Sequence, residues 1–123
     1  MSVKVAFITG SAKRIGATTA SYLHNAGFNI VLHCHHSTEA AHALLSTLNA
    51  RRENSANLVV ADLCAIEGLE SLAEQVVNAF GRIDVLVNNA SSFYPTPLGK
   101  ITLAHWQDLF GSNVQAPLFL AQY

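Results

Sequence analysis

The sequence predicts an α/β fold in which helices cover both faces of a parallel β-sheet. Short runs of β-branched and apolar residues alternate along the chain with longer segments whose apolar residues recur every three or four positions. Helix-length segments separate the strands, so each connection is a crossover that sets the strands parallel. The 123 residues contain no repeat, low-complexity tract or linker, which indicates a single domain.

Each predicted strand is a short apolar run, and each predicted helix follows one. Gly10 closes the first strand, whose composition is typical of a strand buried on both faces. Gly27 and Gly81 are placed to stop the first and third helices. The predicted strands are residues 3–9, 29–33, 57–61 and 83–87, and the predicted helices are residues 15–25, 38–52 and 66–80.

The regular alternation ends after the fourth strand. Residues 89–102 form the longest loop, which contains Pro95, Pro97 and Gly99, and a ligand is expected there. From residue 103 to the end the pattern is helical, with an interruption predicted at Pro117.

Composition excludes several classes of partner. The formal net charge is -1 and the seven Lys and Arg residues form no run, so no basic surface for nucleic acid or an anionic membrane is expected, and a small molecule is favoured. A run of about 18 apolar residues and a signal-peptide pattern are both missing, which predicts no membrane span and no export. The two cysteines, Cys34 and Cys64, lack metal-ligand spacing and suit the cytoplasm.

The turn after the first strand, TGSAKRIG, is typical of a dinucleotide site. Gly10 permits a tight bend, and Gly16 lets the helix pack closely on the strand. Backbone N–H groups at the start of the helix, around Ile15, then face an anion. Lys13 and Arg14 add positive charge beside a pyrophosphate.

The end of the second strand predicts NADPH as the cofactor. A fold specific for NAD usually places Asp or Glu about 20 residues after the glycines, where it binds the ribose hydroxyls. Here that place holds His35, His36 and Ser37, and the first acid after Gly16 is Glu39. These side chains can hydrogen-bond a 2′-phosphate, and no carboxylate is present to repel it.

A zinc site is the alternative interpretation of the same segment, with His33, Cys34, His35 and His36 as ligands. Closed zinc sites gather ligands from more than one short segment. Neighbouring strand residues also point to opposite faces of the sheet, so four consecutive side chains do not converge on one ion. We therefore favour phosphate binding and predict no metal.

Two further segments end at the same edge of the predicted sheet. Asp62 and Leu63 follow the third strand, where an adenine ring is expected. The Asp62 carboxylate can accept from the adenine amino group, or it can serve as a helix N-cap or turn residue. Asn89, Ala90 and Ser91 follow the fourth strand, where small side chains let a ribose and nicotinamide approach the backbone.

These motifs resemble the short-chain dehydrogenase/reductase family, which has a Rossmann-type, doubly wound parallel sheet. The matches occur in family order over nearly the whole chain, at residues 9–16, Asp62, residues 88–90 and Asn113. The family's middle glycine of the first turn is replaced here by Arg14. That replacement, the histidine-rich segment ending at Ser37, and the sequences LNARR and NASSFYPTP are similar to the pteridine reductase branch.

Resemblance to that branch implies reduction of dihydropterin or dihydrofolate to the tetrahydro form with NADPH. It implies that Arg14 contacts both the phosphates and the pterin, that Ser91 hydrogen-bonds near cofactor and substrate, and that Phe93 stacks on the pterin. Stacking between two rings fits hydride transfer, because it holds a flat heteroaromatic in place. His36 stands where that branch has arginine, so a weaker or pH-dependent grip on phosphate is expected. The resemblance also suggests a homotetramer.

Asn113 matches the family's helix asparagine, and Pro117 follows four residues later. Because proline has no N–H, the Asn113 carbonyl is expected to lose its helical partner and accept from a water that relays protons. A kink that only improves packing is the alternative explanation.

The family's Tyr-x-x-x-Lys pair does not follow Asn113 in these residues. We therefore expect residues 1–123 to be the N-terminal part of a single NADP-binding domain, inactive alone, with the C-terminal catalytic part absent. The sheet would be truncated after its fourth strand and the following helix, leaving that strand at an edge of the order 3-2-1-4-5-6.

Two other functions stay open: another short-chain reductase that acts on a carbonyl, and a non-catalytic piece that binds only a nucleotide or a partner subunit. His24, His42 and His105 are expected at surface or half-buried positions without a role. Trp106 and Phe110 are expected to form a core or subunit-contact stripe.

Overall fold

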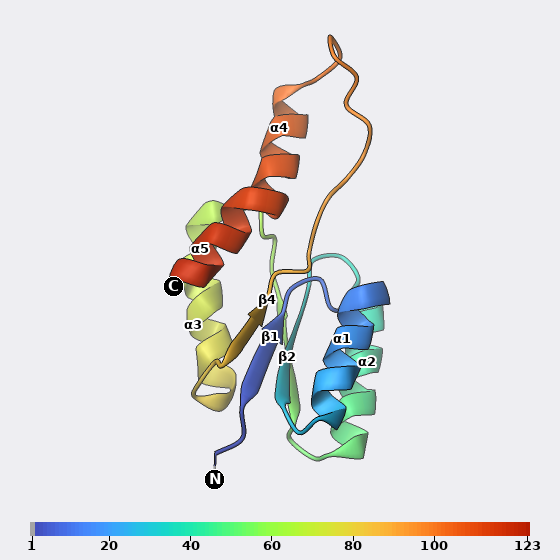
Figure 1. Ribbon diagram of the computed structural model, residues 1–123, viewed down its shortest axis with the longest axis vertical. Coiled ribbons are helices and arrows are strands. Elements are labelled where there is room, and N and C mark those ends of the chain that lie inside the picture. Colours follow the sequence, from blue (N-terminus) through green and yellow to red (C-terminus); the bar gives the residue numbers. More distant parts are fainter. Residues whose placement is uncertain (1) are drawn as a thin grey trace.

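The computed structural model describes residues 2–123, which form a four-stranded parallel sheet with helices on both faces (Figure 1). Ile8 lies opposite Leu32 on one side and opposite Val87 on the other, and all strand pairs are parallel. The strand order β3-β2-β1-β4 confirms the α/β, Rossmann-like prediction and places β4 at an edge. The strands are β1 (Val5–Ile8), β2 (Asn29–Cys34), β3 (Ala56–Val60) and β4 (Val85–Val87).

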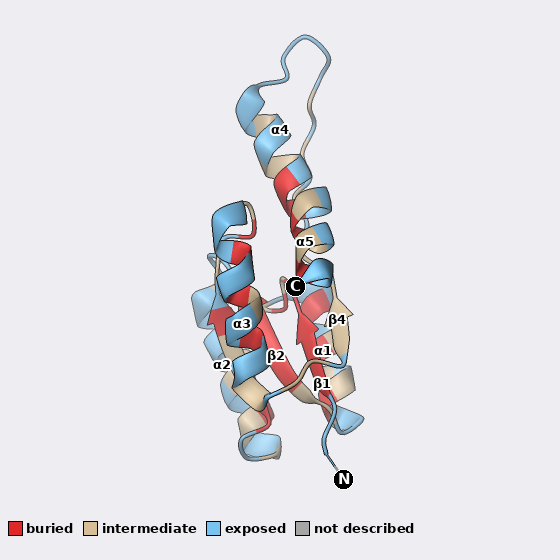
Figure 2. Ribbon diagram, turned by 90° about the vertical axis from the view of Figure 1, so that its left-hand side faces the viewer, coloured by how far each residue is buried: buried red, intermediate tan, exposed pale blue. Residues whose placement is uncertain are grey.

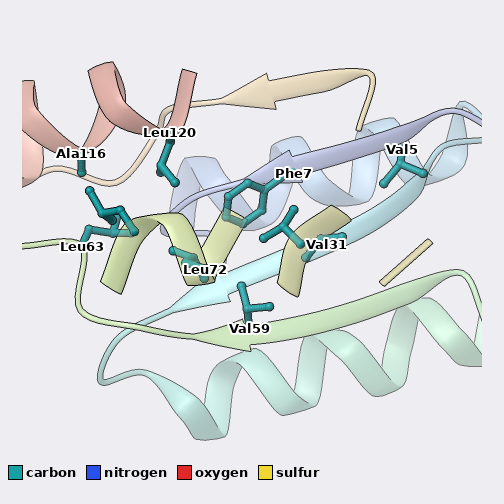
Figure 3. Packing of buried hydrophobic residues seen from close by; sticks show 10 residues of the cluster. Val5, Phe7, Val31, Val59, Leu63, Leu72, Ala116 and Leu120 are labelled. Atoms are coloured by element: carbon teal, nitrogen blue, oxygen red, sulfur yellow. The ribbon is translucent and has the colours of Figure 1, made fainter. Parts of the chain in front are cut away.

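Alternate residues of β1 contribute to two cores, one on each face of the sheet. Val5 and Phe7 belong to a cluster with α3 (Leu69–Phe80) and α5 (Ala116–Gln122), shown in Figure 3. Ala6 and Ile8 belong to the other cluster, with α1 (Arg14–Asn25) and α2 (Thr38–Arg51). All the β1 side chains are buried, as expected of a strand inside a parallel sheet.

The third predicted helix is wrong at its start. Residues 66–80 divide into a 3₁₀ turn (Ile66–Gly68) and α3. Gly68 is the last residue of the 3₁₀ turn and the N-cap of α3. Glycine has a low helix propensity, which is consistent with a change of helix type at this position. Gly81, with φ of 81°, ends α3 as predicted.

The predicted interruption at Pro117 lies earlier in the chain. A π-helix (Gly111–Gln115) joins α4 (Leu103–Phe110) to α5, and the Ala116 N–H donates to the Gly111 carbonyl. In a regular helix the Pro117 ring would press on the Asn113 carbonyl. The wider turn before the proline makes this adjustment, and Pro117 itself falls in the first turn of α5.

The loop after β4 and α4 extend beyond the end of the sheet (Figures 1 and 2). On α4 the Trp106 and Phe110 rings stack with centroids 4.1 Å apart, and both side chains are exposed. The prediction that they form a core stripe is therefore wrong, while a subunit contact stays a prediction. In the described part of the chain, residues 2–123, no helix has the length and apolar character needed to cross a membrane.

Candidate functional site

A cavity of about 470 Å³ opens at the carboxyl ends of the strands, the edge where open parallel sheets bind ligands. Most residues that the sequence predicted for binding line it together: Gly10, Lys13, Arg14, Ile15, Gly16, His35, Asp62, Leu63, Asn89, Ala90 and Ser91. It is also lined by Cys64, Ser92, Asp108 and Ser112, which were not predicted to bind a ligand, and by His33, which entered only the zinc alternative.

Two glycines let the turn after β1 close against its neighbours. Gly10 has φ of 61°, and a Cβ there would lie 2.9 Å from the Ala90 Cα. A Cβ on Gly16 would lie 2.3 Å from the Gly10 carbonyl oxygen and 2.6 Å from Asn89 Nδ2. Neither position has room for a side chain, so α1 begins directly against the turn.

Arg14 adopts a backbone conformation that usually belongs to glycine. Its φ is 54°, a left-handed value that costs a residue with a Cβ about 1–3 kcal/mol. Its side chain and that of Lys13 are exposed at the cavity. The first turn of α1 carries no acidic residue, so the positive end of the helix and two cations meet at one place.

Thr9 and Asn89 hold the turn against the segment that follows β4. Asn89 Nδ2 donates to the carbonyls of Thr9 and Gly10 at 3.1 and 3.0 Å. Thr9 Oγ1 accepts from the N–H groups of Asn89 and Ala90, each at 3.0 Å. The Asn89 amide nitrogen therefore fixes the shape of the turn, while the residue also lines the cavity.

Asp62 has the turn role that the sequence left open. Its Oδ1 accepts from the Cys64 N–H at 2.9 Å, which closes a local turn after β3. The Asp62 side chain is exposed at the cavity.

Leu63 is buried and packs into the core shown in Figure 3. Burial raises the pKa of the Cys64 thiol, which keeps it protonated.

The histidine segment does not act as one unit. His35 and His36 are exposed, and their rings lie 3.7 Å apart between centroids. His35 lines the main cavity, whereas His36 lines an adjoining depression. Ser37 precedes α2 and is not among the residues that line either one. Across residues 2–123 no group of three or more His, Cys, Asp or Glu side chains is arranged to hold a metal ion.

The loop after β4 is attached to α4 by a polar network. The Tyr94 hydroxyl donates to Asp108 Oδ2 at 2.8 Å, and Ser92 Oγ donates to Oδ1 at 3.3 Å. The hydrogen bond to Asp108 raises the pKa of the Tyr94 hydroxyl. The NASSFYPTP segment contains Ser92 and Tyr94, but no sequence motif marked Asp108 as their partner, because the three residues meet only when the loop folds back on α4.

Asn113 and Phe93 lie outside the cavity lining. The Asn113 side chain accepts from the Ser92 N–H at 3.0 Å and donates to the Ser92 carbonyl at 2.8 Å, so it clamps the loop. The Phe93 side chain is 91% exposed. Neither side chain is itself part of the lining, although Asn113 bonds to Ser92, which does line the cavity.

His33 is the largest omission of the sequence analysis. It is 2% exposed, lies beneath the turn and bonds to both of its neighbours in the sheet. Alternation along β2 was the available signal, because it places His33 and His35 on the same side of the strand.

His24 was also wrongly expected at a surface or half-buried position. It is buried at the far end of α1, with Nε2 2.7 Å from Ser55 Oγ.

Comparison with known proteins gives one family. The model of short chain dehydrogenases matches residues 4–123. A pteridine reductase 1 from Leishmania tarentolae is 44% identical over 94% of this chain and 51% of its own length. A hydroxynaphthalene reductase from Aspergillus fumigatus is 32% identical over 100% of this chain and 45% of its own.

A more distant relative is a 3-oxoacyl-(acyl-carrier-protein) reductase from Staphylococcus aureus, 29% identical over 91% of this chain and 45% of its own length. The chain thus spans about half the length of the curated relatives it matches.

Proposed function

The chain belongs to the short-chain dehydrogenase family, and we propose that it forms the cofactor-binding part of an NADPH-dependent pteridine reductase. The observation that carries the proposal is the turn after β1, where Arg14 stands in place of the family's glycine and has a left-handed φ of 54°. A strained residue persists where its surroundings require it, and here the side chain it presents is a cation beside the cavity.

The residues of the cavity fit NADPH. Lys13, Arg14 and the first amides of α1 would hold the pyrophosphate, as helix N-termini do for anions. His35, His36 and Ser37 would bind the 2′-phosphate, since no carboxylate occupies the end of β2. The adenine would lie against Asp62 and Leu63, and the nicotinamide side against Asn89, Ala90 and Ser91. When bound, NADPH supplies the hydride.

We place the pterin at the side of the cavity nearest the loop. The Phe93 side chain is exposed and does not pack in the core, so its ring would be free to stack on the flat bicyclic ring of a pterin. Ser91 would donate or accept a hydrogen bond at the ring edge, and Arg14 would contact its polar substituents. The 44% identity to a pteridine reductase supports this substrate class.

Asn113 would support proton delivery through its main-chain carbonyl, which would hold a water that relays protons. Its side chain is engaged by Ser92, so the main-chain carbonyl, which lies within the π-helix, is the group that would accept from a water. The acid that donates the proton is proposed to lie outside residues 1–123.

A second candidate is a short-chain reductase that acts on a carbonyl. The hydroxynaphthalene and oxoacyl reductases among the relatives favour it. A non-catalytic nucleotide-binding piece is the third. The intact mass of the protein purified from its source separates the third from the others, since 13.2 kDa favours the piece and a mass about twice that favours an enzyme of the relatives' length.

We also propose a cytoplasmic homotetramer. Both cysteines of the described chain are free, which suits a reducing compartment, and the exposed Trp106–Phe110 stack offers an apolar contact. Light scattering of the purified protein measures the assembly, and a monomer at micromolar concentration would remove this part of the proposal.

Equilibrium titration tests the cofactor and the substrate together. NADPH should bind at least about tenfold more tightly than NADH, because a 2′-phosphate adds charge-assisted hydrogen bonds. Dihydrofolate should bind only after NADPH, since the nicotinamide forms one face of its pocket. Equal affinity for the two cofactors would contradict the role given to His35, His36 and Ser37, and dihydrofolate binding without cofactor would contradict the stacked arrangement.

A further inference from the structure

We propose that His33 is a positioning residue that fixes the turn after β1, and that through it the start of α1 is oriented to bind the cofactor's pyrophosphate. The inference rests on the proposed NADPH site and assigns the affinity of that site in part to a side chain that is 2% exposed and bonded to Gly10 and Ala61. It is drawn from the hydrogen bonds around one buried side chain.

The His33 imidazole connects the two segments on either side of β2. Its Nδ1 accepts from the Gly10 N–H at 2.9 Å. Its Nε2 lies 2.9 Å from the Ala61 carbonyl oxygen, at the end of β3. The edge of the ring packs against Phe7 of β1, with the two rings perpendicular, and the side chain is 2% exposed. The ring therefore has one orientation.

These partners also determine the protonation of the ring. A backbone N–H can only donate, so Nδ1 must be unprotonated, and a carbonyl can only accept, so Nε2 must carry the proton. The neutral Nε2–H form is the one state that satisfies both contacts. Asparagine could supply the acceptor near Nδ1 and glutamine the donor near Nε2, but neither side chain reaches both partners.

The main chain of His33 holds the next residue of the turn. The Ser11 N–H donates to the His33 carbonyl at 2.9 Å, and the His33 N–H donates to Ser11 Oγ at 2.9 Å. The amides of Gly10 and Ser11 are thus both used by His33 and are not free for a ligand. A phosphate must be bound by the amides further along, at the start of α1, with Lys13 and Arg14.

Acid should release the Gly10 amide. Protonation of Nδ1 would set two donors against each other at 2.9 Å. Burial is the main cause that lowers the pKa of His33, the bond to Ala61 opposes it, and the charge of His35 lowers it further. The bond to Gly10 is therefore present at neutral pH and lost only as the pH falls below about 6.5, through the lowered pKa. The titratable and charged groups that share the cavity with His33 are Lys13, Arg14, His35, Asp62, Cys64 and Asp108.

Two matched variants test the proposal by NADPH titration at pH 7.5. His33→Asn keeps an acceptor for Gly10 and should bind NADPH within about threefold of the parent protein. His33→Gln keeps only the donor for Ala61 and should bind at least about tenfold more weakly, the loss expected for one buried amide without a partner. A merely structural ring would make both variants equally weak, and that result would overturn the proposal.

A second measurement does not require a variant to fold. In the parent protein the amide resonance of Gly10 should shift with the same midpoint, below pH 6.5, as the His33 ring nitrogens. A Gly10 resonance that ignores the titration of His33 would overturn the proposal.

The outcomes also separate this inference from the proposed function. A parent protein that binds NADPH, with both variants equally weakened, overturns the role of His33 alone. A parent protein that binds neither NADPH nor NADH overturns the cofactor site and the role of His33 with it.

Discussion

The cavity has two sides that are built in different ways. On the cofactor side the turn after β1 is held by backbone and buried groups, from Thr9, His33 and Asn89, in contacts of 2.9–3.1 Å. On the substrate side the loop after β4 extends beyond the sheet and is largely exposed, as Figure 2 shows. It is attached to α4 through the side chain of Asp108 and to the π-helix through the side chain of Asn113.

This difference separates what each side can recognise. The turn, which is fixed by main-chain bonds and by glycines, is proposed to bind a feature that nicotinamide cofactors share, the pyrophosphate. A loop fixed by a few exposed side chains can vary without disturbing the sheet, so substrate choice can reside there. Relatives named for a pteridine, a hydroxynaphthalene and an oxoacyl reductase are consistent with that division.

The largest expected loss of NADPH affinity comes from a substitution at Gly16, which packs against the turn after β1. In Gly16→Ala the new Cβ would lie 2.3 Å from the Gly10 carbonyl oxygen, so the turn must move. A displacement of this size should weaken NADPH binding by about a hundredfold and cost about 1–3 kcal/mol of stability. Titration and thermal unfolding measure the two effects.

Gly68→Ala is the matched control, because a Cβ there has no neighbour within 4 Å in residues 2–123 and Gly68 has a negative φ. It should leave NADPH binding unchanged. Tight binding by Gly16→Ala would contradict the view that the turn is rigid.

Arg14 allows the strain and the charge of the cofactor side to be separated. Arg14→Gly relieves a left-handed φ of 54°, so the protein should become more stable by about 1 kcal/mol. It also removes a cation beside the pyrophosphate, so NADPH should bind about twentyfold more weakly. Arg14→Lys is the control, since it keeps both the charge and the strain and should move neither measurement as far. If Arg14→Gly lowered both the stability and the NADPH affinity, the left-handed φ of Arg14 would not be a source of strain, and the two effects would not be separable.

The sequence was sufficient to predict that the residues of the first turn lie together, because that motif consists of residues adjacent in the chain. Gly10, Gly16 and Arg14 were identified from one turn of eight residues, and the structure places them at one cavity. The alternation of strands and helices likewise predicted a parallel sheet, and the order expected from the family resemblance agrees with the observed order β3-β2-β1-β4.

The sequence was insufficient where residues distant in the chain meet. Asp108 reaches Ser92 and Tyr94 only after the loop has folded onto α4, and no spacing rule joins these positions. His33 was considered only as a zinc ligand, and its hydrogen bonds to Gly10 and Ala61 were not predicted. A histidine in an apolar strand gives the same sequence pattern whether or not it forms such bonds. An interruption of the helix was predicted at Pro117, whereas the π-helix lies before it, since proline marks that a helix must adjust but not on which side.

Phe93 tests the substrate side directly. Its side chain is 91% exposed, so Phe93→Ala should leave the unfolding temperature and NADPH affinity unchanged. Loss of one stacked ring should weaken dihydrofolate binding to the NADPH-loaded protein by about tenfold. Leu98→Ala is the control in the same loop, at 96% exposure, and should have no effect. Equal dihydrofolate affinities for all three proteins would remove the stacking role from Phe93.

Asp108 should have the smallest effect, and one confined to the loop. Asp108→Ala removes the acceptor of both Tyr94 and Ser92 but keeps the main-chain carbonyl to which Ser112 donates at 2.9 Å. Because the loop is attached by few exposed bonds, trypsin should cleave after Lys100 about threefold faster, while NADPH affinity stays the same. Tyr94→Phe removes only one of the two bonds and should give an intermediate rate. If Asp108→Ala weakened NADPH binding as much as it speeds cleavage, the two sides of the cavity would be coupled, and the loop could not vary independently of the cofactor site.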